Sequence, residues 1–555
     1  MKITVNDTLI ELHNGARVKD AILRYYTIKG QKMPGNLPDV EDRFGNSVAP
    51  DGELTDGNIL FIRSKRKRRS SLLKMILMVL TAGLLAACSS VKHSRITLPA
   101  ERSAVIFAVN DMHAAIDNFP KLAYIVDSLK TIYPGMLLVS AGDNQTGDPV
   151  NDQFPEKGLP VIELMNATGF DLSAVGNHEF DSHPEGFASL TNKARFSFIC
   201  ANISADPRLN VRVSPYKIFT LPNGLKLAFL GLLQVSQNGI PDTHPDNTKG
   251  FIYRSPFETA REYLWLKDSS DIFIALTHIG FEEDVKLAET MPAGIDLIIG
   301  GHSHTRVDKE QIRNGILITQ AESKLKYGTL IRLDVSSDGT LRKSMELINI
   351  RDSKKEKPSI RALVDKYNDN PVLKEVIATT TDDFSSSEEL GYLMADGQRA
   401  AAGADIAVMN PGGVRIDRLE KGPITMKNVY QLDPFGNELV VFKLTGEEFY
   451  DFMRAAWLVD GKSPLYTSGI RTELKVSASG DLEDLKAFTE NGTPLKMDQT
   501  YTVAMNSYMA QVYKYRHNDP GQSLFITTAD ALISYLKKQG TVRSYRGEKR
   551  NRIIR

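Results

Sequence analysis

The sequence is poor in cysteine and has no excess of charge of either sign. Its 555 residues include two cysteines, Cys88 and Cys200, which are too few for a disulfide framework or a zinc ribbon. Lys and Arg together number 68, as do Asp and Glu, so no overall field favours a nucleic acid as the main partner. Any metal site must therefore be built from His, Asp and Asn side chains.

Residues 65–90 are typical of membrane targeting. Five basic residues (65–69) precede an uncharged apolar run of 13 residues, 75–87, which would be about 20 Å long as a helix. That is short for a hydrocarbon core of about 30 Å but normal for the apolar region of a signal peptide. The run ends in Leu85-Ala86-Ala87-Cys88, which resembles the lipobox of bacterial lipoproteins, where the cysteine is acylated and becomes the mature N-terminus.

Cys88 is therefore the predicted lipidation site, and an uncleaved signal-anchor helix is the alternative. Both interpretations attach the protein to a bacterial membrane and place the residues after 90 outside the cytoplasm, in the periplasm or on the cell surface. Residues 1–64, if retained, would then be cytoplasmic.

The first 64 residues have the pattern of a small folded domain. Alternating apolar and polar residues over 1–7 and 9–12, a helical spacing of apolar residues over 18–25 and a closing strand at 59–62 give the order ββ-α-β. This order resembles a ubiquitin-like β-grasp domain. It has no terminal Gly-Gly, so a structural or adaptor role is expected, with a partner left open. An upstream extension absent from the mature protein is the alternative.

The composition, 42% hydrophobic and 25% charged, is that of a soluble globular protein, and the length predicts two or three domains. After residue 100 a βαβ pattern begins, in which apolar strands end in polar clusters. The clusters are Asn110-Asp111-Met112-His113, Gly142-Asp143, Gly176-Asn177-His178-Glu179-Phe180-Asp181, Thr277-His278 and Gly301-His302-Ser303-His304. Because ligands bind outside the carboxyl ends of strands in α/β sheets, these clusters can form one site.

Each cluster alone is weak, since a single Gly-Asp is usually a turn and a lone His is usually structural. Their order resembles that of the calcineurin-like metallophosphoesterases. The Phe-Asp after Gly-Asn-His-Glu, together with Asn410-Pro411-Gly412-Gly413-Val414-Arg415, narrows the resemblance to the 5′-nucleotidase and UDP-sugar hydrolase family over residues 101–530.

Phosphate-ester hydrolysis needs a nucleophile near neutral pH and neutralisation of the phosphoryl charge, and a pair of divalent metals supplies both. The resemblance implies two such ions (Zn, Mn, Mg or Co). Asp111, His113 and His304 would hold one, Asn177, His278 and His302 the other, and Asp143 would bridge them. His178 would contact the phosphoryl or leaving oxygen, with Asp181 fixing its orientation and charge.

The second domain is expected to bind the nucleotide. Asn410 and Arg415 match the family's substrate loop, and Phe435 matches an aromatic that stacks on the base. A second stacking aromatic is left open among Tyr508, Tyr513 and Tyr515, and an Arg usual in the family is missing near 385–389. Ala114 also stands where the family usually has Gly, which should shift a tight turn without removing a ligand.

The predicted fold class is α/β (α+β multidomain), with a four-layer α/β/β/α metallophosphoesterase domain, an α+β substrate-binding domain and a small N-terminal β-grasp-like domain. The predicted divisions are 1–64 (β-grasp), 65–90 (basic cluster and signal segment), 101–350 (metallophosphoesterase), 351–375 (linker and connecting helix) and 376–555 (substrate binding). The helical pattern that begins in the linker runs from residue 359 to about 379.

The predicted function is an exported, membrane-anchored phosphohydrolase acting on nucleotides. The alternatives are a UDP-sugar or 2′,3′-cyclic-nucleotide hydrolase and a catalytically idle nucleotide-binding lipoprotein, which is disfavoured because all the candidate ligands are present. Nucleic-acid binding is not expected, because the basic C-terminal residues have no aromatic or groove motif beside them. These are Arg543, Arg546, Lys549, Arg550, Arg552 and Arg555.

Overall fold

The computed structural model describes residues 1–12, 16–29, 37–63, 102–236, 239–243, 245–291, 293–460 and 462–554. The predicted signal segment, with Cys88, lies outside these ranges. Within them, no helix combines the length and the apolar character needed to cross a membrane.

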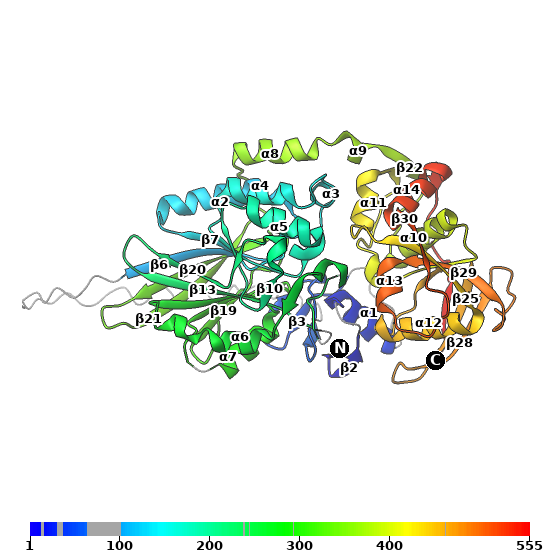
Figure 1. The fold of residues 1–555 in the computed structure, drawn as a ribbon, viewed down its shortest axis with the longest axis horizontal. Coiled ribbons are helices and arrows are strands. Elements are labelled where there is room, and N and C mark those ends of the chain that lie inside the picture. The colour runs from blue at the N-terminus through cyan, green and yellow to red at the C-terminus, as the bar shows by residue number, and fades with distance from the viewer. Residues whose placement is uncertain are drawn as a thin grey trace, which may run out of the picture.

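Two β-sheets packed face to face form the core of the domain that follows residue 101 (Figure 1). The first has the order β11 (Val213–Ser214), β9 (Ser197–Ile199), β8 (Leu172–Ala174), β7 (Leu137–Ser140), β6 (Arg102–Val109), β20 (Tyr327–Val335) and β21 (Leu341–Asn349). The second has the order β12 (Tyr216–Thr220), β13 (Lys226–Leu233), β15 (Ile272–His278), β16 (Leu297–Ile299), β19 (Ile316–Thr319) and β18 (Gln311–Arg313). A short pair, β10 (Ile203–Ala205) and β14 (Phe251–Tyr253), lies outside both sheets.

Alternation along the strands explains the layers. Ile106 and Ala108 of β6 point into the apolar layer between the sheets, whereas Phe107 and Val109 pack beneath helices on the outer face. The first sheet is covered by α2 (Phe119–Ile132), α4 (Leu159–Thr168) and α5 (His183–Lys193), and the second by α6 (Pro256–Glu262) and α7 (Phe281–Thr290). The short helix α3 is Pro149–Asp152. The predicted four-layer α/β/β/α fold is confirmed.

The strands that carry the polar clusters are parallel to their neighbours. In the first sheet β6, β7 and β8 run parallel, and in the second sheet β13, β15, β16 and β19 do. Their carboxyl ends therefore lie at one end of the sandwich, facing the rest of the molecule.

Helices α8 (Pro358–Asn368) and α9 (Pro371–Lys374) lead to the second lobe. A helix was predicted to run from residue 359 to about 379, and this is wrong beyond 374. Residues Val376–Thr380 form strand β22, because their β-branched side chains favour a strand and their backbone pairs with β24 and β31.

The second lobe is α+β, as predicted. Its sheets are β24 (Gly422–Thr425), β22 and β31 (Thr541–Val542); β26 (Tyr466–Ser468), β23 (Ile406–Met409), β29 (Thr500–Asn506), β25 (Glu438–Thr445) and β30 (Gln522–Thr527); and β28 (Leu482–Thr489), β27 (Ile470–Val476) and β32 (Asn551–Ile554). Its helices are α10 (Ser387–Ala402), α11 (Met426–Leu432), α12 (Gly446–Val459), α13 (Ser507–Val512) and α14 (Thr528–Gln539).

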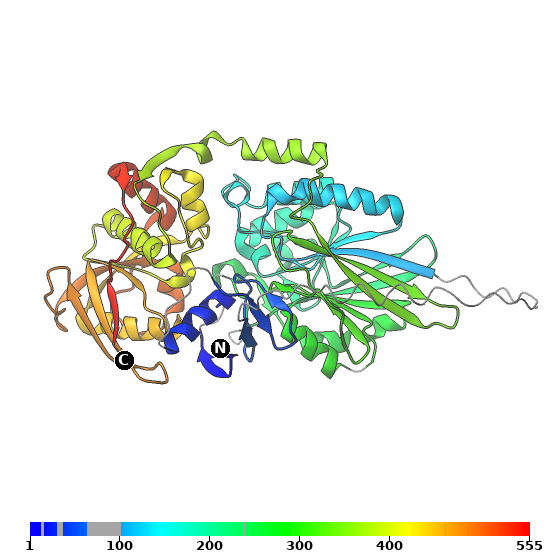
Figure 2. The same cartoon turned by 180° about the vertical axis from the view of Figure 1, so that it is seen from behind.

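The N-terminal unit lies between the two lobes in both views (Figures 1 and 2). It comprises β1 (Lys2–Val5), β2 (Thr8–Glu11), α1 (Val18–Ile28), β3 (Val40–Asp42), β4 (Ser47–Val48) and β5 (Ile59–Ile62). Strand β1 pairs antiparallel with β2 and parallel with β5, and the sheet encloses its own apolar core. The β-grasp assignment stays a prediction. The sheet continues into the large domain, because β4 pairs with β17 (Thr305–Arg306).

Candidate functional site

All seven predicted metal ligands lie together at the carboxyl ends of the strands. Asp111 and His113 follow β6, Asp143 follows β7, Asn177 follows β8, His278 ends β15, and His302 and His304 follow β16. Their exposed fractions are 6% or less. Burying this many polar side chains is costly unless they bind a partner, so their convergence indicates a site rather than a packing feature.

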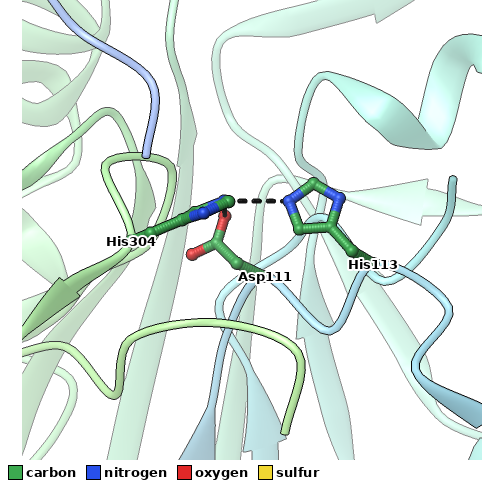
Figure 3. A group of neighbouring side chains, drawn as sticks. All are labelled: Asp111, His113 and His304. Atoms are coloured by element: carbon green, nitrogen blue, oxygen red, sulfur yellow. Dashed lines mark hydrogen bonds and ion pairs between the residues drawn. The ribbon is translucent and has the colours of Figure 1, made fainter. Parts of the chain in front are cut away.

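Asp111, His113 and His304 form the first group (Figure 3). The Nε2 atoms of the two histidines are 2.9 Å apart, and His304 Nε2 is 3.4 Å from Asp111 Oδ1. His113 Nδ1 lies 3.0 Å from the carbonyl oxygen of Thr146, which can only accept, so Nδ1 carries the proton and Nε2 offers a lone pair. His304 Nδ1 is held in the same way by Asp51 Oδ1, at 3.2 Å. Two facing lone pairs beside a carboxylate fit a cation.

Asn177, His278 and His302 form the second group. Asn177 Oδ1 lies 3.2 Å from His278 Nε2 and 3.1 Å from His302 Nδ1, while its Nδ2 donates to the carbonyl of Asp242. His278 Nδ1 donates to the carbonyl of Ala141 at 2.8 Å, so the lone pair of a neutral His278 lies on Nε2, where it can bind a metal. The oxygen donor and the imidazole nitrogens are the ligand types that suit borderline divalent ions.

Asp143 lies between the two groups. Its Oδ2 is 3.1 Å from His278 Nε2 and 4.0 Å from His113 Nε2, and its Oδ1 accepts from the backbone N–H of His178. Burial would raise the pKa of Asp143, but His278 and His178 hold it well below its usual value. The carboxylate is therefore ionised and within reach of ligands from both sets.

The pKa values of the buried histidines are shifted in opposite directions. Burial and the neighbouring His304 lower the pKa of His113 to about 3, which keeps it neutral as a ligand must be. Burial would also lower the pKa of His278, yet Asp143 and Asp111 raise it to about 10. The carboxylates thus attract positive charge more strongly than burial repels it, which is the environment that a divalent cation requires.

His178 and Asp181 form a separate pair beside these groups. His178 Nδ1 is 2.7 Å from Asp181 Oδ2, and Asp181 also accepts from the hydroxyls of Thr146 and Thr243. Burial would lower the pKa of His178, but Asp181 and Asp143 raise it well above its usual value. An imidazolium held in this orientation can donate from Nε2 to an anionic oxygen.

The backbone of the site is strained in several places. Asp111, His113, Asp143, His302 and His304 all have positive φ, which non-glycine residues rarely adopt. Ala114 also has φ of 50°, in the left-handed region that favours glycine, while Asp111 and His113 remain with the other ligands. At Gly176 a Cβ would collide with Asp143, so only glycine allows the loops after β7 and β8 to approach this closely.

Three carboxylates at the site were not predicted from the sequence. Glu179 accepts from the backbone N–H groups of Asp143, Asn144 and Gly176, and its place in the Gly-Asn-His-Glu motif was a signal. Glu53 and Asp51 come from the N-terminal unit and contact His178, His302 and His304. Their sequence, Pro50-Asp51-Gly52-Glu53, is that of an ordinary turn and carried no such signal.

The predicted substrate residues are brought together in part. A cavity of about 650 Å³ between the lobes is lined by Arg415 and Phe435 together with His113, His178 and His304. The Arg415 guanidinium lies 5.0 Å from the centre of the Phe435 ring. Asn410 lies apart from them, buried, with its Oδ1 accepting from Asn506 Nδ2 at 2.9 Å.

Two protein families match the chain. Residues 104–306 match the calcineurin-like phosphoesterase family, and residues 374–513 match the 5′-nucleotidase C-terminal domain. The chain joins a calcineurin-like phosphoesterase to a 5′-nucleotidase C-terminal domain. The predicted family is thus confirmed.

The chain is similar to curated and solved members of this 5′-nucleotidase group. It is 30% identical over 474 residues to the endonuclease YhcR of Bacillus subtilis, covering 75% of this chain but 38% of that protein's length. It is 26% identical to the 5′-nucleotidase of Vibrio cholerae, covering 80% of this chain and 91% of that one. The crystal structure of a 5′-nucleotidase precursor from Thermus thermophilus matches with a TM-score of 0.68 at 25% identity, covering 82% of this chain and 99% of that one.

Two of the candidates for a second stacking aromatic in this nucleotidase-type domain have structural roles. The Tyr513 hydroxyl donates to Asp460 Oδ2 at 2.6 Å, and the ring is buried. Tyr515 packs against Phe452 and His517. Tyr508 is half-buried and remains the open candidate. Cys200 is a buried free thiol.

Proposed function

We propose that this chain is an exported, membrane-anchored phosphohydrolase that uses two divalent metal ions to release phosphate from nucleotides. The supporting observation is the arrangement of two buried ligand sets around Asp143, with the His178–Asp181 pair beside them and a cavity that reaches Arg415 and Phe435.

Asp111, His113 and His304 would hold one ion, Asn177, His278 and His302 the other, and Asp143 both. Bound there, the two ions would neutralise the phosphoryl charge and activate the attacking water. The tautomers fixed by the carbonyls of Thr146 and Ala141 direct Nε2 of His113 and of His278 inward.

The remaining residues act on the substrate directly. His178, kept cationic by Asp181, would donate from Nε2 to a phosphoryl or leaving oxygen where negative charge develops. Arg415 would bind an anionic group, and Phe435 would stack on the base with the ring face that the guanidinium leaves uncovered.

The activity is tested by phosphate release from a panel comprising a nucleoside monophosphate, a UDP-sugar, a 2′,3′-cyclic nucleotide and a small aryl phosphate. We expect metal-dependent turnover that is fastest with the nucleoside monophosphate. Preference for the UDP-sugar or the cyclic nucleotide would assign the chain to the corresponding branch. Nucleotide binding without turnover of any ester would identify an idle binding protein.

A further inference from the structure

A turn of the N-terminal unit enters the proposed metal site. Glu53 is 5% exposed, with Oε1 3.4 Å from His178 Nε2 and Oε2 3.4 Å from His302 Nδ1. Asp51 contacts the other side of the site, with Oδ1 3.2 Å from His304 Nδ1. The carboxylate of Glu53 therefore lies beside the imidazole that is proposed to contact the phosphoryl group.

The turn is held there by backbone contacts on both sides of Ser303. Strand β4 pairs with β17, with Val48 opposite Thr305 and Ser47 opposite Arg306. The amides of Ala49 and Glu53 donate to the carbonyls of His304 and His302, each at 3.3 Å. These contacts use the loop that carries two predicted metal ligands.

Gly52 makes the approach possible. Any side chain at this position would collide with the carbonyl of Ser303, so glycine is needed for the turn to lie this close. At the far edge of the contact, the Ile59 amide donates to Glu282 Oε1 at 2.9 Å.

The same unit also contacts the second lobe. Arg24, which is 3% exposed, donates from Nη1 to the carbonyl of Lys462 at 2.7 Å and from Nη2 to that of Gly480 at 3.2 Å. Its guanidinium lies 5.7 Å from the centre of the Trp457 ring. The N-terminal unit therefore lies between the two lobes and contacts both of them.

We infer that residues 1–63 are an intramolecular inhibitor, and that Glu53 occupies the place of the substrate phosphoryl group. A carboxylate and a phosphate monoester are both anions bound by cationic donors, and His178 Nε2 cannot face both at once. The inference rests on the proposed phosphohydrolase function, because it assigns an occupant to the same site.

The chain also contains a means of release. In the proposed topology the N-terminal unit and the catalytic domain share a compartment only before export, so the docked arrangement would form on the cytoplasmic side of the membrane. Cleavage before Cys88, as proposed for the lipobox, would separate residues 1–87 from the catalytic domain and remove the inhibitor.

The first test compares Glu53→Gln and Gly52→Val with the unchanged chain on a small aryl phosphate. Loss of the charge or of the close approach should raise kcat/KM about 5- to 150-fold, the range of typical intramolecular couplings. Asp39→Asn is the control, because it removes an exposed carboxylate from the same unit away from the docking turn. Arg17 and Lys19 of the unit also line the cavity. Equal or lower activity in both variants would show that the unit supports the site or binds the substrate through these two residues, and would overturn the inference.

A reversible cross-link tests the same contact without relying on weakened docking. Ser47 and Arg306 are directly opposed in an antiparallel pair, a spacing of about 4.5–5.5 Å between Cα atoms that a disulfide can bridge. The double variant Ser47→Cys/Arg306→Cys, made with Cys88→Ser, should be inactive when oxidised and recover on reduction. Full activity in the oxidised, cross-linked form would contradict inhibition.

Hydrogen exchange separates this inference from the proposed activity. Inorganic phosphate added with Mn²⁺ should increase exchange at the amides of Ala49 and Glu53, because phosphate would displace the turn. That increase would support the inference even if no ester were hydrolysed. Unchanged exchange at saturating phosphate would overturn it, whatever the activity of the enzyme.

Discussion

His178 differs from His113 and His278 in the way its two nitrogens are used. In His113 and His278 the Nδ1 atom donates to a carbonyl, and Nε2 faces the ligand groups. In His178 the Nδ1 atom faces the carboxylate of Asp181, which stabilises the cation. Because Asp181 occupies Nδ1 and stabilises the cation, His178 is suited to donate from Nε2 to an anionic substrate oxygen.

The first prediction follows from this difference. His178→Ala should lower the rate by about 10²- to 10⁴-fold, the range for a positioned acid, while the bound metal stays unchanged. Metal analysis and kcat on the same sample measure this. Loss of metal from the variant would show that His178 is a ligand.

Asp181→Asn is the matched variant, because it keeps the shape and removes the charge. Asp181 raises the pKa of His178, so without the Asp181 charge the imidazolium should lose its proton at a lower pH. The alkaline limb of the pH–rate profile is therefore expected to move to lower pH. A profile identical to that of the unchanged enzyme would show that the charge of Asp181 has no part in catalysis.

At the scale of elements, the 3₁₀ helix η2 (His178–Ser182) organises the site. It carries His178 and Asp181 three residues apart on one side, and Glu179 on the other. The Glu179 carboxylate bonds to three backbone amides and to the side chain of Asn144, which joins the loops after β7 and β8. Glu179 is a positioning residue, since it holds the backbone of Asp143 and of Gly176, next to Asn177, and does not line the substrate cavity.

The second prediction tests that role. Glu179→Gln should reduce metal affinity about 10- to 100-fold, the usual cost of losing a group that supports a ligand. A titration with Mn²⁺ measures it, and Glu185→Gln on the exposed face of α5 is the control. Equal affinity in the two variants would leave Glu179 with no part in the metal site.

Some of the helices and strands could be predicted from the sequence, and others could not. The apolar strands and the polar residues at their ends are local features, so Asp111, Asn177 and His302 were predictable from the chain alone. Strand β22 was mistaken for helix, because its identity depends on pairing with β24 and β31. The pairing of β4 with β17 joins residues more than 250 positions apart, and neither segment has a sequence pattern that predicts it.

At the scale of the molecule, the substrate cavity is shared by three parts of the chain. The metal ligands belong to the first lobe, Arg415 and Phe435 to the second, and Arg17 and Lys19 to the N-terminal unit. Changes in the second lobe can therefore alter substrate choice while the metal groups stay intact.

The third prediction uses this division. Phe435→Ala should weaken nucleotide use by about 1–3 kcal/mol, the range for a base stacked on an aromatic ring, with little effect on a small aryl phosphate. Arg415→Ala should also weaken nucleotide use. The ratio of kcat/KM for the two substrates measures both. Equal losses on both substrates would assign these residues to folding or lobe closure.

The fourth prediction concerns attachment to the membrane. If Cys88 is the acylated cysteine of a lipobox, as proposed, Cys88→Ser should abolish lipid labelling and leave an uncleaved or soluble protein. Labelling with a radioactive fatty acid in a bacterial host measures this, with Cys200→Ser as the control. Acyl labelling that persists in Cys88→Ser would exclude the lipobox.

The most direct test of the whole account is phosphate release from a nucleoside monophosphate before chelation, after chelation and after divalent metal is restored. The unchanged chain should lose activity on chelation and regain it with the metal, with two ions bound per chain. Asp143→Ala should fail to recover, because its carboxylate lies within reach of both ligand sets. Phosphate release that survives chelation, or recovery in Asp143→Ala equal to that of the unchanged chain, would contradict the dinuclear metal site.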